Sequence, residues 1–174
     1  MNRTHHATTV HPTPTSVRPV TGSTASRPAH AGRGHDHRHD LPFSAAVGWG
    51  LVVGVANAAA PLAFWWLEAS SVHALAIALI AAVYIGFAVA DGRRHVIAAE
   101  CAVAAVFVTV AAAAVPLSPW LLVAGYFAHG CKDLWQHRSQ FVAGTRWWPP
   151  FCLAVDWTVA GIITVAIAAG VGFH

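Results

Sequence analysis

The stretch HGCKDLWQHR at residues 129–138 places several ionisable side chains directly after the apolar run WLLVAGYFA. In an α-helix, residues four apart lie about 40° from one another around the axis, so His129, Asp133 and His137 form one stripe. Imidazole and carboxylate together are the ligands that suit Zn, Fe or Mn. The same groups could instead relay protons, bind a polar head group, or form a hydrogen-bonded network that locks helices together.

Two more acids stand alone inside apolar runs, Glu100 in residues 96–115 and Asp156 in residues 151–173. An acid or a histidine inside a membrane costs several kcal/mol unless it is paired or hydrated. The stripe is therefore expected to face these two acids across the helices. This arrangement predicts a polar pocket near the cytoplasmic leaflet that opens to the cytoplasm. The candidate cofactor of this pocket is Zn or Fe. The candidate metal ligands are His129, Asp133, His137, Glu100 and Asp156.

Two further groups of ionisable residues have weaker claims to a function. A secondary polar cluster is predicted close to the same membrane face, from Asp91, Arg93, Arg94, His95 and Lys132. In the N-terminal segment, HDHRHD brings together His35, His37 and His39, a tract that can bind metal loosely. A solvated tail with incidental metal affinity is the favoured interpretation of that tract. No nucleophile motif identifies a catalytic residue.

The composition indicates where these residues lie. The chain has 174 residues, of which 56% are hydrophobic and only 10% charged, with a mean hydropathy of +0.55. An average soluble domain carries about 25% charged residues, so this balance is typical of a membrane protein. The net charge of +3 is small, and no nucleic-acid-binding module is visible. Three cysteines without CxxC spacing make a disulfide framework unexpected.

Five apolar runs are the predicted elements: residues 43–67, 72–90, 96–115, 120–137 and 151–173. A membrane-spanning helix needs about 20 mostly apolar residues. The run 120–137 reaches that length only if its polar last turns lie at the interface or inside a bundle. Residues 1–42 are rich in His, Pro and Thr, and their composition predicts a disordered tail. The predicted fold is all-α, a polytopic membrane helical bundle of about five transmembrane helices.

The basic residues predict how this bundle is oriented. All 10 Lys and Arg residues fall in the N-terminal tail, in residues 91–95, or around residues 132–146, which share one side of a five-span bundle. By the positive-inside rule that side is the cytoplasm, so the N-terminus is expected inside and the C-terminus outside an inner (plasma) membrane. Gly50 and Gly54 form a GxxxG pair, for which packing within the chain is favoured over a dimer motif. The lipid bilayer is the expected partner; a homo-oligomer or a membrane partner is left open.

Three stretches resemble a family of small uncharacterised integral membrane proteins of actinobacteria and related bacteria: AAVYIGFAVADGR (81–93), SPWLLVAGYFAHGCKDLWQHR (118–138) and RWWPPFCLAVDW (146–157). The resemblance covers roughly residues 72–170 and is carried by the motifs HGxxDxWxH and WWPPFCxxxDW. It implies an inner-membrane location. It implies no activity, substrate or cofactor.

Three functions are compatible with these residues. The first is a binding or transport-type protein whose pocket holds a metal ion or protons. The second is a membrane metalloenzyme acting on a lipid-like substrate, with His129 and His137 as ligands and Glu100 or Asp156 as general base. The third is a non-catalytic packing or assembly subunit. Whether the protein is an enzyme is left open by the sequence.

Overall fold

The predicted all-α fold is confirmed by the computed structural model, which describes residues 43–172. That range contains helices but no strand. The helices are α1 (Phe43–Ala58), α2 (Ala60–Ala63), α3 (Ala69–Asp91), α4 (Arg94–Leu117), α5 (Trp120–Ser139) and α6 (Trp148–Ala168).

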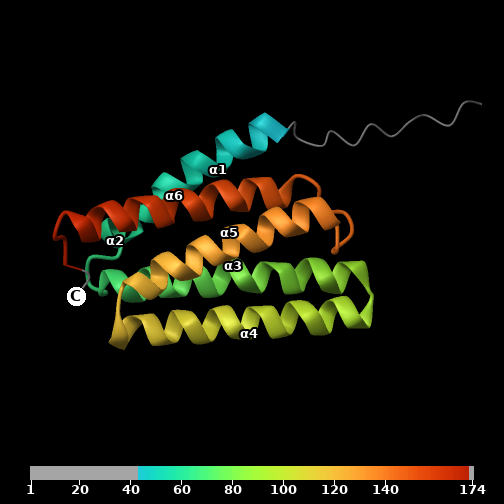
Figure 1. Cartoon of the computed structure of the whole chain (residues 1–174), viewed down its shortest axis with the longest axis horizontal. Coiled ribbons are helices and arrows are strands. Elements are labelled where there is room, and N and C mark those ends of the chain that lie inside the picture. The colour runs from blue at the N-terminus through green and yellow to red at the C-terminus, as the bar shows by residue number, and fades with distance from the viewer. Residues whose placement is uncertain (1–42, 173–174) are drawn as a thin grey trace, which may run out of the picture. The chain divides into compact units, whose positions relative to one another are not determined.

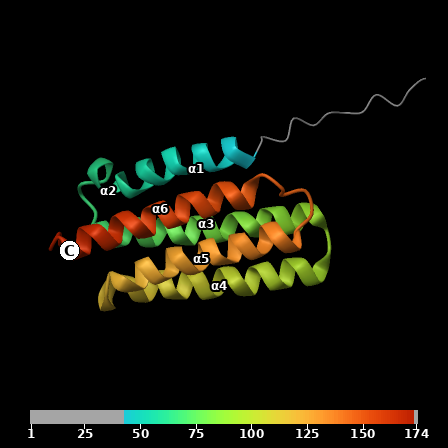
Figure 2. The same cartoon turned by 45° about the horizontal axis from the view of Figure 1, so that its top comes forward.

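Four of these helices, α3 to α6, run alternately up and down and lie side by side (Figures 1 and 2). The α3–α4 and α5–α6 connections therefore meet at one end of the bundle. That end carries Arg93, Arg94, Arg138 and Arg146, and is called the basic end below. Helix α1 packs along α6, so the first helix lies against the last one. Short connections favour this arrangement, because they join helices that are neighbours in space.

The first apolar run differs from the prediction, which was a single helix over residues 43–67 with a kink at Pro61. Helix α1 ends at Ala58, and Pro61 lies in the first turn of the short helix α2. Proline has no backbone N–H and clashes with the preceding turn, so it begins a helix more easily than it continues one. The same preference explains why α6 begins at Trp148, ahead of Pro149 and Pro150, rather than at residue 151.

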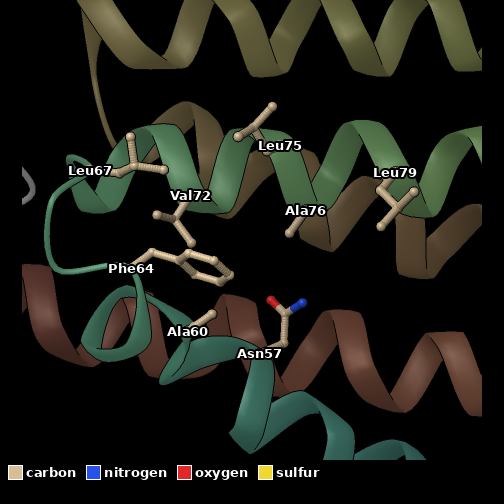
Figure 3. Close-up of a pocket in the computed structure, with 8 residues that line it drawn as sticks. All are labelled: Asn57, Ala60, Phe64, Leu67, Val72, Leu75, Ala76 and Leu79. Carbon is tan, nitrogen blue, oxygen red and sulfur yellow. The ribbon is translucent and has the colours of Figure 1, made fainter.

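A lateral pocket of about 290 Å³ lies between the α1–α2 segment and the first half of α3 (Figure 3). Its walls are mainly apolar, with Phe64, Leu75 and Leu79 among them, and Asn57 supplies the amide group. The Asn57 side-chain oxygen accepts a hydrogen bond of 3.3 Å from the Tyr126 hydroxyl. Asn57 thus links α1 to α5, the role expected of a polar side chain between membrane helices.

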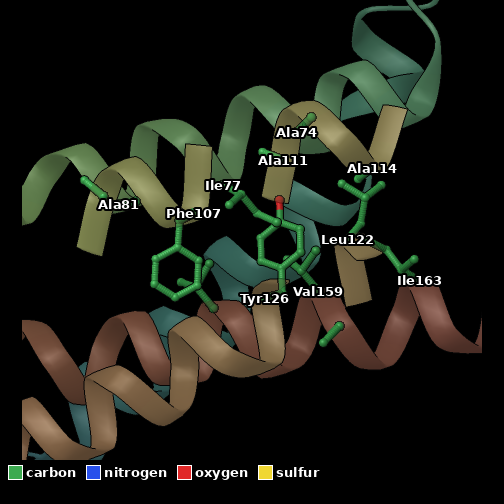
Figure 4. Close-up of a cluster of buried hydrophobic side chains, with 13 residues drawn as sticks. Ala74, Ile77, Ala81, Phe107, Ala111, Ala114, Leu122, Tyr126, Val159 and Ile163 are labelled. Carbon is green, nitrogen blue, oxygen red and sulfur yellow. The ribbon is translucent and has the colours of Figure 1, made fainter. Parts of the chain in front are cut away.

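The described residues form two apolar clusters, of which the smaller one, Tyr84, Ala88, Val96 and Val142, lies toward the basic end. The larger one, called the apolar core below, lies in the half of the bundle away from the basic end (Figure 4). Tyr126 of α5 occupies its middle, between Ile77 of α3 and Val159 of α6. Many core positions are alanines, which let the helix backbones approach closely in lipid. The labelled members of the core are Ala74, Ile77, Ala81, Phe107, Ala111, Ala114, Leu122, Tyr126, Val159 and Ile163.

Large apolar side chains also cover the outer surface of the bundle. Leu79 is 69% exposed, Val106 is 61% exposed and Val165 is 69% exposed. Three helices, α3, α4 and α6, are long and apolar enough to cross a membrane. Exposed apolar side chains on such helices are the surface that lipid would cover.

Helix α1 packs against α6 through Gly50 and Gly54. A Cβ atom at Gly50 would overlap the carbonyl oxygen of Phe151, and one at Gly54 would lie 2.8 Å from Cβ of Thr158. Both glycines are buried. The GxxxG pair is therefore used for packing within the chain.

Replacing Gly50 by alanine is expected to lower the thermal unfolding midpoint of the detergent-purified protein. The added methyl group must push α1 away from α6, and overpacking of this kind costs about 1–3 kcal/mol. Gly48→Ala is the matched control, because a Cβ at Gly48 meets nothing within 4 Å. Equal midpoints for the two variants would contradict the close α1–α6 contact.

Candidate metal centre

The buried polar group in the middle of the bundle consists of His129 and Asp133 on α5 and Asp156 on α6. The Nδ1 atom of His129 lies 2.7 Å from Oδ2 of Asp156 and 3.4 Å from Oδ2 of Asp133. The three residues are at most 2% exposed. Each offers one ligand atom, and these atoms all lie within 4.8 Å of one another. Among the described residues this is the group of His, Cys, Asp and Glu side chains with the geometry to hold a metal ion.

Helix geometry explains how these side chains meet. His129 and Asp133 are four residues apart on α5, so they lie one turn apart on the same face. That face turns toward α6, which brings Asp156 opposite His129. His129 is ten residues from the end of α5 at Ser139, about 15 Å along the helix axis. The group therefore lies about halfway along α5, which has 20 residues.

A chain of polar contacts continues from Asp133 to α3 and α4. The Tyr84 hydroxyl donates a hydrogen bond of 2.7 Å to Oδ1 of Asp133. The Lys132 ammonium lies over the Tyr84 ring, 3.1 Å from its centroid. Lys132 also donates a hydrogen bond of 2.8 Å to Oε2 of Glu100. All four helices of the up-and-down bundle thus contribute a side chain to one buried network.

Several polar atoms of this network have no hydrogen-bond partner within the described chain. They are Nε2 of His129, Oδ2 of Asp133 and Oδ1 of Asp156. Unpaired buried polar atoms are costly, and each asks for a physical explanation such as an ion or a bound water. A network that serves only to lock helices together would be expected to satisfy its own members.

The donor set fits a divalent transition-metal ion. Imidazole nitrogen and carboxylate oxygens are the ligands that Zn and Fe accept. For bonds of about 2.0–2.1 Å, neighbouring ligand atoms in a tetrahedral site lie about 3.4 Å apart. The 3.4 Å between His129 and Asp133 already matches that spacing. The 2.7 Å between His129 and Asp156 is a hydrogen-bond distance, so a metal would replace the proton on Nδ1 and move Asp156 slightly outward.

Two of the five predicted ligands lie outside this group. Glu100 is 2% exposed but pairs with Lys132 instead. The ring of His137 lies 5.6 Å from the ring of Phe43, at the start of α1. His137 is eight residues beyond His129, which places it about 12 Å further along α5 and about 80° around the helix axis. Of the predicted stripe on α5, His129 and Asp133 belong to the buried group and His137 does not.

The predicted secondary polar cluster at the basic end is divided in the structure. Asp91 accepts hydrogen bonds from the Arg93 side chain at 2.6 and 2.7 Å and from the Ala143 backbone N–H at 2.7 Å. Arg93 also donates to the carbonyl oxygen of Phe141 at 2.6 Å. The hydrogen bond to Asp91 raises the pKa of the Arg93 guanidinium. These bonds hold the α3–α4 turn against the α5–α6 loop.

The other members of that cluster do not join Asp91 and Arg93. Lys132 belongs to the buried network through Glu100. The ring of His95 lies 6.5 Å from the ring of Phe141, and Arg94 is exposed without a polar partner among the described residues. Lys132 was misplaced because its position on α5, one residue before Asp133, gave no sign of which helix it would face.

Substitution of Asp91 by alanine should loosen the α5–α6 loop. The backbone N–H of Ala143 would lose its charged acceptor, so its hydrogen exchange should accelerate by roughly tenfold or more. Hydrogen–deuterium exchange read by mass spectrometry on peptides covering residues 140–147 measures this change. Arg94→Ala serves as the control and should leave the exchange of this loop unaltered; equal acceleration in both variants would argue against the contact.

Two residues of the site were missed by sequence reasoning. Tyr84 is fully buried and donates to Asp133, and Gln136 is fully buried one turn beyond Asp133. A tyrosine in the middle of an apolar run, away from the membrane interface, was the available signal, because a buried hydroxyl needs a partner. Gln136 borders the stripe in sequence, but only the packing of α5 shows that it is enclosed. The predicted tail site, His35, His37 and His39, lies outside the described residues.

No protein-family model, curated protein or solved structure matches this chain. The class of this protein is therefore defined by its fold and its buried polar group. Over residues 43–172 it is a helical bundle in which α3, α4 and α6 are long and apolar enough to span a membrane, and it encloses a buried group of one histidine and two aspartates.

Proposed function

We propose that this is a multi-pass inner-membrane protein that binds a divalent transition-metal ion, of the Zn or Fe class, between α5 and α6. His129, Asp133 and Asp156 are the ligands. Tyr84 orients Asp133 by donating a hydrogen bond to the carboxylate oxygen that faces away from His129. The observation that carries the proposal is the convergence of three ligand atoms within 4.8 Å in a group that is at most 2% exposed.

Electrostatics supports a cation at this place. Two carboxylates beside one neutral imidazole carry two negative charges, which two protons or one divalent metal ion would neutralise. Repulsion between like charges is strong in a medium of low dielectric constant, so an added cation is stabilised there. The Lys132 ammonium does not supply this charge alone, because it already pairs with Glu100 at 2.8 Å.

The arrangement of the helices supports crossing of the membrane by α5 and α1 as well. Helix α5 begins where α4 ends and finishes where α6 begins, so it must traverse the same thickness as its neighbours. Its charged side chains Lys132 and Asp133 are enclosed by the bundle rather than placed toward lipid. Helix α1 lies along α6. Under the positive-inside rule, the basic end faces the cytoplasm, which puts the N-terminus inside and the C-terminus outside.

The alternative functions differ in what they require of the group. A proton-binding role needs the same residues without a metal. A membrane metalloenzyme acting on a lipid-like substrate needs, in addition, an open coordination position and a path for the substrate. A packing subunit needs only stability. The unpartnered atom Oδ2 of Asp133, which belongs to the proposed ligand set, favours binding over packing alone.

Metal analysis of the purified full-length protein tests the proposal. The three histidines of the HDHRHD tract are first replaced (His35→Asn, His37→Asn, His39→Asn), so that metal bound by this tract is not counted. We expect about one equivalent of Zn or Fe, or one equivalent of Co²⁺ after reconstitution, with a d–d spectrum of nitrogen and oxygen ligands. A protein that holds no metal in the tail-substituted form, while titrating Co²⁺ without saturation, would refute the site.

A further inference from the structure

Buried polar atoms without a partner among the described residues continue beyond the proposed ligands toward the basic end. Gln136 lies three residues after Asp133, on the same face of α5, and is fully buried. Neither its amide nitrogen nor its amide oxygen has a hydrogen-bond partner among the described residues. Nε1 of Trp148, at the start of α6, is likewise buried and unpartnered. These atoms lie between the group around His129 and the basic end.

The opposite direction along α5 leads into the apolar core, where the Tyr126 hydroxyl is already within hydrogen-bond distance of the Asn57 side-chain oxygen and of the His73 backbone oxygen, at 3.3 and 3.2 Å. The residues that follow His129 on this face toward the start of α5 are Tyr126 and Leu122, both fully buried. The ring of Phe107 lies edge-on to the His129 ring, with centroids 4.8 Å apart. Ile77 and Val159 complete this layer (Figure 4). Apolar side chains offer no ligand to an ion that has lost its water, so passage through this layer is unfavourable.

We propose that the cation enters and leaves the site from the basic end, past the amide of Gln136 and alongside the small apolar cluster of that end, rather than through the apolar core. This inference rests on the proposed function. An amide oxygen is a neutral, hard ligand, so it can replace a water on a passing divalent ion without trapping it. One arginine of the basic end, Arg93, is paired with Asp91 and with the carbonyl oxygen of Phe141. Its charge is therefore compensated at the point of entry.

Thiol accessibility tests the route without any need for bound metal. In full-length protein with Cys101, Cys131 and Cys152 replaced by alanine, Gln136→Cys and Leu122→Cys each place one thiol on the same face of α5. Both parent side chains are fully buried. The probe is Ag⁺ added to the protein in sealed liposomes, and the readout is the loss of thiol that a maleimide can label after unfolding. We expect modification at least tenfold faster at residue 136, and only from the basic end. Equal rates, or faster modification at residue 122, would overturn the route.

Metal exchange supplies a second measurement. Gln136→Leu should slow both loading and release of Co²⁺ by tenfold or more while the dissociation constant stays the same. Gln136→Asn, which keeps a neutral amide oxygen in the path, should restore most of the rates. A change in affinity with unaltered rates would assign Gln136 to the site itself and overturn the route.

The two proposals fail in different ways. If wild-type protein binds no metal, the proposed function fails, and the Ag⁺ result still decides whether the basic end is the open one. If metal is bound but residues 136 and 122 react equally, only the route is wrong.

Discussion

Replacement of His129 by alanine is expected to remove the bound metal. His129 is the nitrogen ligand of the proposed set, and its Nδ1 atom lies within 3.4 Å of a carboxylate oxygen of each aspartate. Loss of a residue that only hydrogen-bonds to a ligand typically costs about 10–100-fold in metal affinity. Loss of a ligand itself should therefore cost at least about 100-fold. Titration with Co²⁺ in the tail-substituted protein, followed by its visible spectrum, measures the loss.

His137→Ala is the matched control for this prediction. It removes the same side chain from the same helix, two turns away, where the ring contacts Phe43 rather than the aspartates. We expect its Co²⁺ affinity to stay within about twofold of the parent protein, because no ligand atom is lost. Equal losses in the two variants would show that both histidines coordinate the metal, as the sequence alone predicted. Retention of metal by the His129→Ala variant would refute the ligand set.

Removal of the Glu100 carboxylate is expected to cause the largest loss of stability among these variants. Glu100 is the ion-pair partner of Lys132, and their side chains are 3% and 11% exposed. Glu100→Ala leaves an ammonium group inside the bundle without its anion, a change that costs about 3–5 kcal/mol in buried pairs. In a chain of this size we expect the unfolding midpoint to fall by roughly 10 °C, measured by thermal unfolding in detergent.

A double substitution separates this charge effect from loss of packing. Glu100→Leu combined with Lys132→Met replaces both members of the pair by apolar side chains of similar size. Such replacements are often neutral or stabilising, so the midpoint should recover most of the loss. Glu68→Ala is the control for removing an acid, because Glu68 is exposed before the start of α3. A double variant as unstable as Glu100→Ala would mean that the pair contributes by packing and not by charge.

Much of the fold could be predicted from the sequence because lipid imposes simple rules on it. Apolar runs of about 20 residues, short connections and alternate placement of basic residues indicated helices that pack in sequence order. Helix ends were less predictable. Pro61 was expected to kink one helix, but α1 ends before it, because the chain also has to turn back toward α3.

The candidate site was partly predictable for a related reason. A lone acid or histidine in an apolar run must find a partner, so Asp156, Asp133 and His129 could be expected to meet. Which partner each acid finds depends on how far each helix is rotated about its axis. Glu100 and Asp156 look alike in the sequence, yet one pairs with Lys132 and the other with His129.

The sequence by itself determined that this chain forms apolar helices and that its few internal charges must be enclosed, because both follow from composition and from the cost of charge in hydrocarbon. Only the tertiary structure decided the pairing. It excluded His137 from the group, brought in Tyr84, and showed that the amide of Gln136 is enclosed without a partner within the described chain. The physical reason is that the rotation and crossing angle of each helix are set by how it packs against its neighbours. Gly50 and Gly54 of α1, for example, allow close contact with α6, and the sequence pattern of one helix does not contain that information.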